Sequence, residues 1–314
     1  MTLRTLGATG LAVHPLCLGT NIFGWTIDEP QSFAVLDAYA AAGGNFLDTA
    51  DSYSSWIPGN SGGESETIIG NWMAARGNRD GIVVATKVGK LAGLEGTSPA
   101  TVRKAAEDSL RRLRTDRIDL YYAHMDDEDT PLEETLGVFG ELVTAGKVRY
   151  VAASNFSAPR LAAALDLARS GRFPSYVAIQ PHYNLVHRDE YEGDLASVCA
   201  REGLACIPYF ALASGFLTGK YRPGGDGGDS PRADGARGYL DGRGTAVLAV
   251  LDVLAASFGT TPAAVALAWL AAQPTVVAPI ASARTPAQLA DLLPMATLEL
   301  GEPELHQLTT ASSL

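Results

Sequence analysis

Short apolar runs alternate along this chain with longer stretches in which apolar and polar residues are mixed. Eight of these runs are rich in Val, Ile, Leu and Ala and are nearly continuous, which is the pattern of parallel strands buried on both faces. The stretches between the runs are long enough for helices. The eight predicted strands span residues 13–20, 45–50, 82–88, 118–124, 148–154, 176–181, 205–210 and 276–281.

Four of the intervening stretches begin with a hydroxyl residue followed by proline, at Ser98-Pro99, Thr130-Pro131, Thr261-Pro262 and Thr285-Pro286. A Ser or Thr at this position accepts a hydrogen bond from a free backbone N–H of the helix. Proline is favoured in the first turn because its missing N–H would have no partner there. Glu133, three residues after Thr130, completes a predicted capping box.

Eight strand–helix alternations predict an α/β fold, a (β/α)8 TIM barrel, formed by residues 1–314 as a single domain. A doubly wound sheet is the alternative, but its usual G-x-G-x-x-G turn is missing after the first predicted strand. Residues 1–12 are rich in turn formers and predict a short N-terminal hairpin closing the barrel bottom. Residues 222–244 are rich in Gly, Asp and Pro and predict one long loop, either functional or disordered.

The 314-residue chain is 46% hydrophobic and 19% charged, and its net charge is −11. No run of Lys or Arg supplies the basic face that nucleic acids and anionic membranes require, so neither is an expected partner. Cys17, Cys199 and Cys206 are too few for a disulfide framework and are expected to be buried free thiols. Without a leader-like N-terminus or a membrane-spanning apolar run, we expect a cytoplasmic protein.

Reactive side chains follow several of the apolar runs, where a barrel places its functional groups. Asp48, Lys87 and His124 lie at the ends of the second, third and fourth runs, and Tyr53 comes shortly after the second. A phenol ionises near pH ~10, and a neighbouring ammonium favours the phenolate, so Lys87 is expected to lower the pKa of Tyr53. Asp48 can keep the lysine charged, and His124 can orient a carbonyl oxygen. The set is suited to protonating a developing alkoxide.

Each of these residues taken alone also has an ordinary structural explanation. An aspartate after a strand often caps a turn, a lysine there is often solvated, and single histidines and tyrosines are often structural. The interpretation therefore depends on their joint placement. No metal site is predicted, because His14, His182, His187 and His306 share no metal-ligand spacing.

Several local strings resemble the aldo-keto reductase family in sequence and in order. They include Asn45-Phe-Leu-Asp-Thr-Ala-Asp-Ser-Tyr53, Ala85-Thr-Lys87, Leu120-Tyr-Tyr-Ala-His124, Ala153-Ser-Asn-Phe156 and Leu217-Thr-Gly-Lys-Tyr221. The resemblance extends from about residue 3 to about residue 292. It implies a (β/α)8 barrel that binds NADP(H) without a Rossmann motif. It also implies reduction of a small-molecule aldehyde or ketone to an alcohol, with Tyr53 as the general acid.

The resemblance also assigns roles to individual residues. Asp48, Tyr53, Lys87 and His124 match the family's catalytic tetrad, Tyr209 matches the aromatic residue on the nicotinamide ring, and Arg284 matches the 2′-phosphate contact. Trp25 and Trp56 are expected to line an open substrate pocket. The implied cofactor contacts are Gly19, Thr20, Asn21, Ser154, Asn155, Gln180, Tyr209, Ala211, Leu212, Gly215, Lys220, Ser282, Arg284 and Gln288. The sequence indicates neither the particular carbonyl substrate nor the oligomeric state.

Two other functions stay open at this point. A Schiff-base aldolase on the same barrel would use Lys87 as its nucleophile, although this leaves Tyr53 without a role. A cofactor-binding regulatory subunit of the same fold is a non-enzymatic alternative, which an intact tetrad does not exclude.

Overall fold

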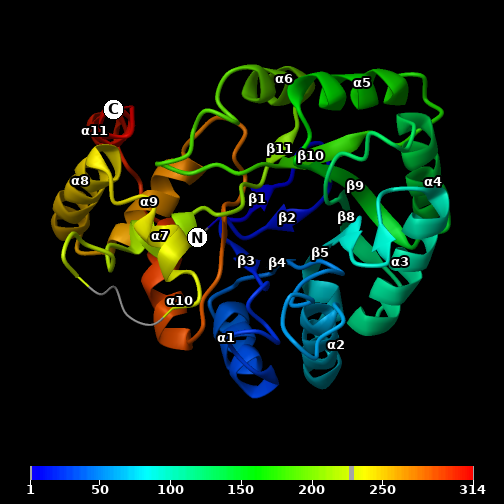
Figure 1. Ribbon diagram of the computed structural model, residues 1–314, viewed down its shortest axis with the longest axis horizontal. Helices are drawn as coiled ribbons and strands as arrows, with labels where there is room; N and C mark the ends of the chain where they lie inside the picture. Colours follow the sequence, from blue (N-terminus) through cyan, green and yellow to red (C-terminus); the bar gives the residue numbers. More distant parts are fainter. Residues whose placement is uncertain (1, 226–229, 314) are drawn as a thin grey trace.

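A curled sheet of eight parallel strands forms the centre of the computed structural model, which describes residues 2–225 and 230–313 (Figure 1). The strands lie in the order β11-β10-β9-β8-β5-β4-β3-β12. Backbone hydrogen bonds from Val277 N to Cys206 O (2.9 Å) and from Ile280 N to Pro208 O (2.9 Å) join the two ends of this order into a barrel. The strands are β3 Cys17–Gly19, β4 Phe46–Asp48, β5 Val83–Val88, β8 Ile118–Ala123, β9 Val148–Ser154, β10 Tyr176–Gln180, β11 Ala205–Cys206 and β12 Ile280–Ala281.

Helices follow the strands and cover the outside of the barrel, which confirms the predicted (β/α)8 fold (Figure 1). The α-helices are α1 Glu29–Ala41, α2 Glu64–Arg76, α3 Pro99–Leu113, α4 Leu132–Thr144, α5 Ala158–Ala168, α6 Asp194–Glu202, α7 Ala233–Arg237, α8 Gly242–Phe258, α9 Pro262–Ala271, α10 Pro286–Leu292 and α11 Glu302–Ala311. Short 3-10 helices are η1 Arg79–Gly81, η2 Ala213–Thr218 and η3 Leu293–Ala296. In the described part of the chain no single helix has the length and apolarity to cross a membrane, and α8 with α9 reaches them only as a pair bent by 99°.

Three of the four predicted helix starts are confirmed, and one is wrong. Ser98, Thr261 and Thr285 each accept a hydrogen bond from the backbone N–H three residues later. The Thr130 hydroxyl instead donates to Asp127 Oδ2 (2.7 Å), and α4 begins at Leu132 without a side-chain cap. Because Pro131 and not Thr130 is the N-cap, Glu133 is only the second residue of the helix, so the predicted capping box does not form.

The N-terminal hairpin is present, and it includes Val13, which was predicted to begin the first barrel strand. Strands β1 Arg4–Thr5 and β2 Ala12–Val13 pair antiparallel, with Arg4 opposite Val13, so the barrel strand starts only at Cys17. Leu6, Leu11 and Val13 pack into the cluster of side chains that fills the barrel interior. The hairpin therefore closes one end of the barrel, as predicted.

Residues 222–244 do not form a single loop, which corrects the prediction. They contain α7 and the first residues of α8, while residues 226–229 lie outside the described residues. Ala233 and Ala236 of α7 are buried and belong to the main hydrophobic core. Small alanine side chains give a weak apolar signal, so the sequence pattern did not reveal this helix.

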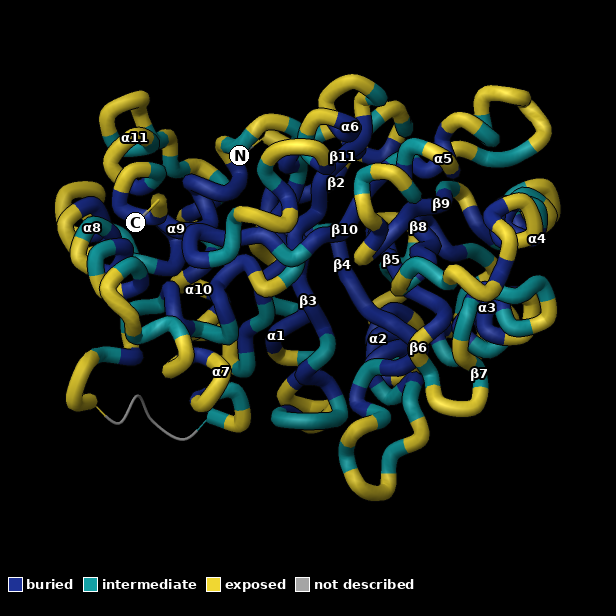
Figure 2. The backbone as a smooth tube through the Cα atoms, turned by 45° about the horizontal axis from the view of Figure 1, so that its top comes forward, coloured by how far each residue is buried: buried dark blue, intermediate teal, exposed yellow. Residues whose placement is uncertain are grey.

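The buried residues form two layers, one inside the barrel and one between the sheet and the helices (Figure 2). In Figure 2 the central strands are dark blue, whereas exposed residues lie on the outer sides of the helices and in the loops. Cys17, Cys199 and Cys206 are all buried and unpaired, as predicted.

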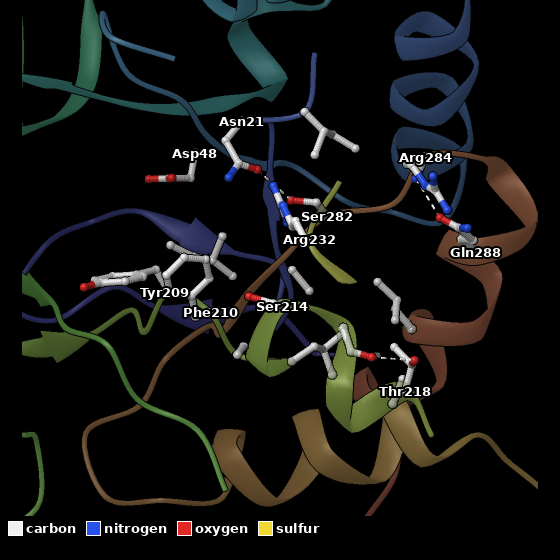
Figure 3. Close-up of a pocket in the computed structure, with 18 of the residues that line it drawn as sticks. Asn21, Asp48, Tyr209, Phe210, Ser214, Thr218, Arg232, Ser282, Arg284 and Gln288 are labelled. Carbon is white, nitrogen blue, oxygen red and sulfur yellow. Dashed lines mark hydrogen bonds between the residues drawn. The ribbon is translucent and has the colours of Figure 1, made fainter. Parts of the chain in front are cut away.

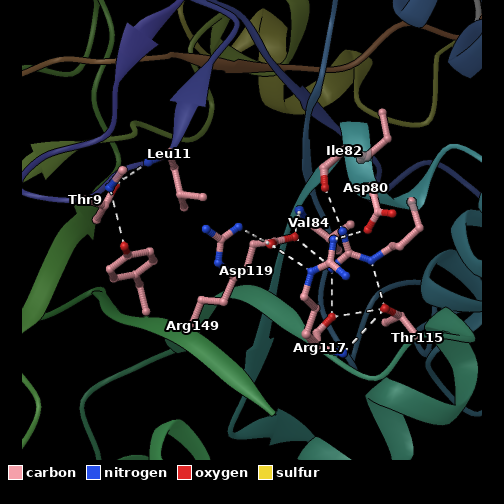
Figure 4. Close-up of polar contacts among 12 residues, drawn as sticks. Thr9, Leu11, Asp80, Ile82, Val84, Thr115, Arg117, Asp119 and Arg149 are labelled. Carbon is pink, nitrogen blue, oxygen red and sulfur yellow. Dashed lines mark hydrogen bonds and ion pairs between the residues drawn. The ribbon is translucent and has the colours of Figure 1, made fainter. Parts of the chain in front are cut away.

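One buried carboxylate organises the amino-terminal ends of the barrel strands. Asp119, the second residue of β8, accepts hydrogen bonds from Arg79 Nη2 (2.8 Å), Val84 N (3.0 Å) and Arg149 Nη1 (3.0 Å) (Figure 4). It is 1% exposed. This network ties three neighbouring strands together at the end of the barrel away from the strand carboxyl ends, so its role is structural.

Candidate active site

Four predicted side chains converge at the carboxyl ends of three adjacent strands. Asp48 ends β4, Tyr53 lies in the turn that follows, Lys87 lies near the end of β5, and His124 follows β8. Lys87 Nζ donates to Asp48 Oδ1 (2.6 Å) and to the Tyr53 hydroxyl (2.8 Å). The rings of Tyr53 and His124 meet edge to face with centroids 6.1 Å apart. The barrel order β4-β5-β8 thus assembles the set that the sequence predicted.

Lys87 is held in a bonding pattern that fits its charged form. It is 0% exposed, and its third donor bonds to Thr49 O (2.8 Å). An ammonium has three N–H donors and a neutral amine only two, so three acceptors match the ammonium. Burial lowers the pKa of Lys87, and the Asp48 carboxylate opposes that effect.

The pKa of Tyr53 moves in the direction opposite to the prediction. Burial, followed by the charge of Asp48 and the hydrogen bond to it, raises the pKa of the phenol well above 10. The expected lowering by Lys87 is outweighed, because the phenolate would lie beside a carboxylate in a dry site. Tyr53 therefore keeps its proton at neutral pH.

His124 is neutral in this environment. Burial, together with the charges of Lys87 and Lys90, lowers its pKa well below 6.5. A neutral imidazole has one N–H donor and one acceptor nitrogen. His124 can therefore donate a hydrogen bond to a carbonyl oxygen without competing with Tyr53 as a proton source.

Hydrogen bonds continue from the tetrad along the next strands of the barrel. Gln180 Nε2, at the end of β10, donates to Asp48 Oδ2 (2.9 Å). Asn155 Nδ2 donates to His124 O (2.8 Å), and the Tyr209 hydroxyl donates to Asn155 Oδ1 (2.9 Å). These contacts fix the orientation of Asp48 and hold the Tyr209 ring close to the tetrad.

A cavity of about 690 Å³ extends from Asp48 and Tyr53 to Arg284. Figure 3 shows Tyr209 and Phe210 at one end, Asn21, Arg232 and Ser282 in the middle, and Arg284 with Gln288 at the other end. Twelve of the fourteen predicted cofactor contacts line it: Asn21, Ser154, Asn155, Gln180, Tyr209, Ala211, Leu212, Gly215, Lys220, Ser282, Arg284 and Gln288.

Gly19 and Thr20 do not line this cavity. A Cβ added to Gly19 would lie 2.7 Å from Ile280 Cγ2, so the glycine allows β3 to pack against β12. Thr20 is buried, and its hydroxyl donates to Asp48 O (2.8 Å). Both residues therefore stabilise the strands that carry the site without contacting the cavity.

Trp25 and Trp56 lie beside the cavity near Tyr53. Trp56 is 49% exposed and meets the Tyr53 ring edge to face at 6.4 Å. Trp25 meets Trp56 edge to face at 5.6 Å. The two indoles thus form an aromatic rim next to the tetrad, adjoining the cavity wall but not part of it.

Sequence reasoning missed several residues that line the cavity, of which Arg232 is the most informative. Burial lowers the pKa of Arg232, and Figure 3 shows it midway along the cavity, between Tyr209 and Arg284. Its Nη2 is buried and has no hydrogen-bond partner among residues 2–225 and 230–313. The other missed residues include Ile22, Thr26, Lys90, Phe210, Ser230, Pro231, Thr261 and Asp291.

Strained backbone is concentrated around the site. Of the seven described non-glycine residues with positive φ, five lie at the cavity or next to a residue that lines it: Ser54, Asn155, Phe210, Ala213 and Ser214. Such conformations cost roughly 1–3 kcal/mol each and persist at functional sites. Gly215, with φ of 93°, continues the left-handed turn in η2 that brings this segment against the cavity.

Three cations along the cavity fit an anionic ligand. Lys220, Arg232 and Arg284 all line it, and none forms an ion pair with a carboxylate in the described part of the chain. A part-buried guanidinium without a counter-ion is unfavourable, and a bound phosphate would relieve that cost. The residues present therefore fit a phosphate-bearing cofactor.

Folding also brings together a cluster that the sequence spacing did not indicate. His182 and His187 stack with ring centroids 3.6 Å apart, and His187 Nε2 lies 3.1 Å from Glu190 Oε1. The ring planes differ by only 12°, so the nitrogens of the two imidazoles lie in nearly parallel planes. His182, His187 and Glu190 can each offer one ligand atom, and these atoms all lie within 4.8 Å of one another, so folding assembles a candidate metal cluster that the sequence spacing did not indicate.

Asp51 lies behind the tetrad in an unusual electrostatic position. It is 0% exposed, and neither carboxylate oxygen has a hydrogen-bond partner among the described residues. Burial, and then the neighbouring charge of Glu66, raises its pKa to about 8. Asp51 is therefore protonated at neutral pH in the folded protein, although it is ionised in the unfolded chain.

We expect Asp51→Asn to flatten the pH dependence of stability. Between pH 4 and 8 the folded protein binds a proton at Asp51 that the unfolded chain has lost, so stability falls as pH rises, by up to about 1.4 kcal/mol per pH unit. Asparagine keeps the shape of the neutral carboxyl and removes this proton uptake. Urea unfolding at pH 5 and pH 7 measures the effect.

Asp80→Asn is the matched control, because the Asp80 side chain is 95% exposed. It should leave the pH dependence as in the wild type. Equal pH slopes for the wild type and Asp51→Asn would show that Asp51 is ionised in the folded protein.

Comparison with known proteins agrees with this geometry. The model of the Aldo/keto reductase family matches residues 15–312. An uncharacterized oxidoreductase of Bacillus subtilis, YrpG, is 35% identical over 96% of this chain and 93% of its own length. Protein tas of Escherichia coli is 34% identical over 96% of this chain and 94% of its own. Norsolorinic acid reductase stcV of Emericella nidulans is 34% identical over 95% of this chain and 78% of its own. Because these matches extend over nearly the whole barrel, the chain belongs to the Aldo/keto reductase family of oxidoreductases.

Proposed function

We propose that this protein reduces an aldehyde or ketone to an alcohol, using NADPH, with Tyr53 as the general acid. The observation that carries the proposal is the contact of Lys87 with both Asp48 and Tyr53 at one end of a long cavity whose other end carries Arg284. A proton donor and a place for an extended anionic cofactor thus share one cavity. The relatives named as oxidoreductases support the same class of reaction.

The four side chains divide the work of proton transfer. When bound, a reduced nicotinamide supplies the hydride that the carbonyl carbon receives. His124 donates a hydrogen bond to the carbonyl oxygen and orients it. Tyr53 gives its proton to that oxygen as negative charge develops there, and Lys87 stabilises the phenolate left behind. Asp48 keeps the lysine charged and in place.

In the same proposal, different cavity residues bind different parts of the cofactor. Asn155 and Gln180 would hold the carboxamide end of the cofactor, and Tyr209 would pack against the nicotinamide ring. Arg232, midway along the cavity, would bind the diphosphate that NADPH and NADH share. Arg284, at the far end, would bind the 2′-phosphate that only NADPH carries.

An aldolase mechanism fits the geometry of Lys87 poorly. A Schiff base requires an accessible neutral amine with a free lone pair. Lys87 is 0% exposed, and three acceptors engage all its donors. It is placed to stabilise a phenolate rather than to attack a carbonyl.

Incubation of the protein with NADPH and a panel of aromatic and aliphatic aldehydes tests the proposal. We expect oxidation of NADPH, followed by its absorbance at 340 nm, with one alcohol formed per NADPH consumed. Borohydride trapping of substrate on Lys87 without NADPH consumption would favour an aldolase instead. Tight NADPH binding with no turnover of any carbonyl would favour a regulatory cofactor-binding subunit.

A further inference from the structure

A fourth cation lines the cavity, on the wall that carries the tetrad. Lys90 begins the short strand β6 Lys90–Leu91, directly after β5, and lines the cavity together with Tyr53 and His124. Its ammonium has neither a hydrogen-bond acceptor nor a carboxylate within 4.0 Å in the described part of the chain. Its opposite residue in the hairpin with β7 Leu94–Glu95 is Glu95, yet the two do not form an ion pair.

Lys90 is separated from the cations that the proposed cofactor needs. Lys220 and Arg232 follow β11 and Arg284 follows β12, whereas Lys90 follows β5, three strands from β12 in the barrel order. The tetrad carboxylate, Asp48, lines the same cavity but is already bonded to Lys87 and Gln180. Lys90 is exposed, and its ammonium pairs with no carboxylate of residues 2–225 and 230–313, so it is free to meet a charged substrate group at the end of the cavity proposed for the carbonyl.

Two lysine charges, those of Lys87 and Lys90, act on the end of the cavity beside the tetrad. Burial and the charge of Lys87 lower the pKa of Lys90. The charges of Lys87 and Lys90 in turn add to burial in lowering the pKa of His124. An anionic group bound at this end would be attracted to the charge of Lys90, and a neutral group would not.

The surroundings also limit the shape of the substrate. Phe210, 43% exposed, lines the cavity, and the indole of Trp56 stands at its rim next to Tyr53. These flat apolar surfaces favour an aromatic body. A single ammonium balances the one charge of a carboxylate, whereas phosphate sites typically gather several donors.

We propose that the substrate carries a carboxylate on an aromatic body in addition to its carbonyl, and that Lys90 binds this carboxylate beside Tyr53 and His124. The inference rests on the proposed carbonyl reduction. It makes Lys90 a specificity-determining residue, since it contacts a part of the substrate that does not react.

Two matched aldehydes test this inference. 4-Carboxybenzaldehyde carries the anion, and methyl 4-formylbenzoate presents the same ring and aldehyde without the charge. For the wild type we expect a higher kcat/KM with the acid than with the ester. Lys90→Met should lower the acid-to-ester ratio of kcat/KM about tenfold, mainly through KM for the acid, and Lys90→Arg should restore most of it. The preference for the acid should weaken as salt rises, because screening acts on a partly exposed ion pair.

Lys104→Met is the control, because Lys104 lies on the outer helix α3 with its side chain 65% exposed. It should leave the ratio unchanged. Equal kcat/KM values for the two aldehydes with the wild type, or equal losses for both with Lys90→Met, would overturn the role of Lys90 while leaving carbonyl reduction intact. If neither aldehyde nor any other carbonyl is reduced, the proposed function itself fails, and the inference fails with it.

Discussion

Replacing Tyr53 with phenylalanine is expected to lower the rate of carbonyl reduction by about 10²–10⁴-fold, the usual contribution of a general acid. The variant loses only the hydroxyl that bonds to Lys87 and Asp48. Because burial and Asp48 raise the pKa of Tyr53, the hydroxyl still carries its proton when the alkoxide forms, and Lys87, the other protonated member, is buried and does not line the cavity. Single-turnover reduction of an aldehyde, with NADPH already bound, measures the chemical step directly.

Cofactor binding should change little in the same variant. We expect the dissociation constant of NADPH to stay within a few-fold of the wild-type value, because the phosphates are assigned to the other end of the cavity. Tyr121→Phe is the matched control, since the Tyr121 hydroxyl is buried without a hydrogen-bond partner among the described residues. Wild-type turnover by Tyr53→Phe would remove Tyr53 from the mechanism.

The barrel itself could be predicted from the sequence because each of its strands is an apolar run buried on both faces. Strand ends were less predictable where backbone pairing depends on distant segments. Val13 pairs with Arg4 in the hairpin and leaves the first barrel strand, and β12 comprises only Ile280–Ala281, although Val277 still bonds to Cys206 across the barrel seam. Apolar character alone does not distinguish these partners.

The tetrad was predictable for a similar reason. Asp48, Lys87 and His124 end consecutive strands of the barrel sheet, so the topology brings them together once the order β4-β5-β8 is known. The direction of the Tyr53 pKa was not predictable, because it depends on how much water the fold excludes. The charge of Lys87 could be anticipated from the sequence, whereas the burial of the Tyr53 hydroxyl, which has the larger effect on its pKa, could not.

Arg232 and Lys90 show where sequence reasoning has no signal. Both are ordinary cations in polar surroundings, one in a Gly-rich stretch and one just after a strand. Only the folded structure shows that both line the cavity without a carboxylate partner in the described part of the chain. Both residues stand out because no carboxylate of the described residues pairs with them, and a local sequence pattern cannot predict the lack of a partner from distant segments.

Arg284→Ala is expected to weaken NADPH binding by about tenfold to a hundredfold and to leave NADH binding nearly unchanged. Hydrogen bonds to charged groups contribute roughly 1.5–3 kcal/mol, which corresponds to that range of affinity. Arg284 lines the far end of the cavity, and its guanidinium has no acid partner among residues 2–225 and 230–313. Its forked N–H groups suit a phosphate, and in a chain of net charge −11 this charge must be balanced locally.

Arg232→Ala provides the contrast that makes this test specific. Arg232 lies midway along the cavity, between Tyr209 and Arg284, where the diphosphate common to both cofactors is placed. It should therefore weaken NADPH and NADH by similar factors, whereas Arg201→Ala, on the outer helix α6, should affect neither. Dissociation constants for both cofactors with all three variants decide the matter. If Arg284→Ala weakens the two cofactors equally, or weakens neither, then Arg284 does not bind the 2′-phosphate, and the preference for NADPH must come from another residue.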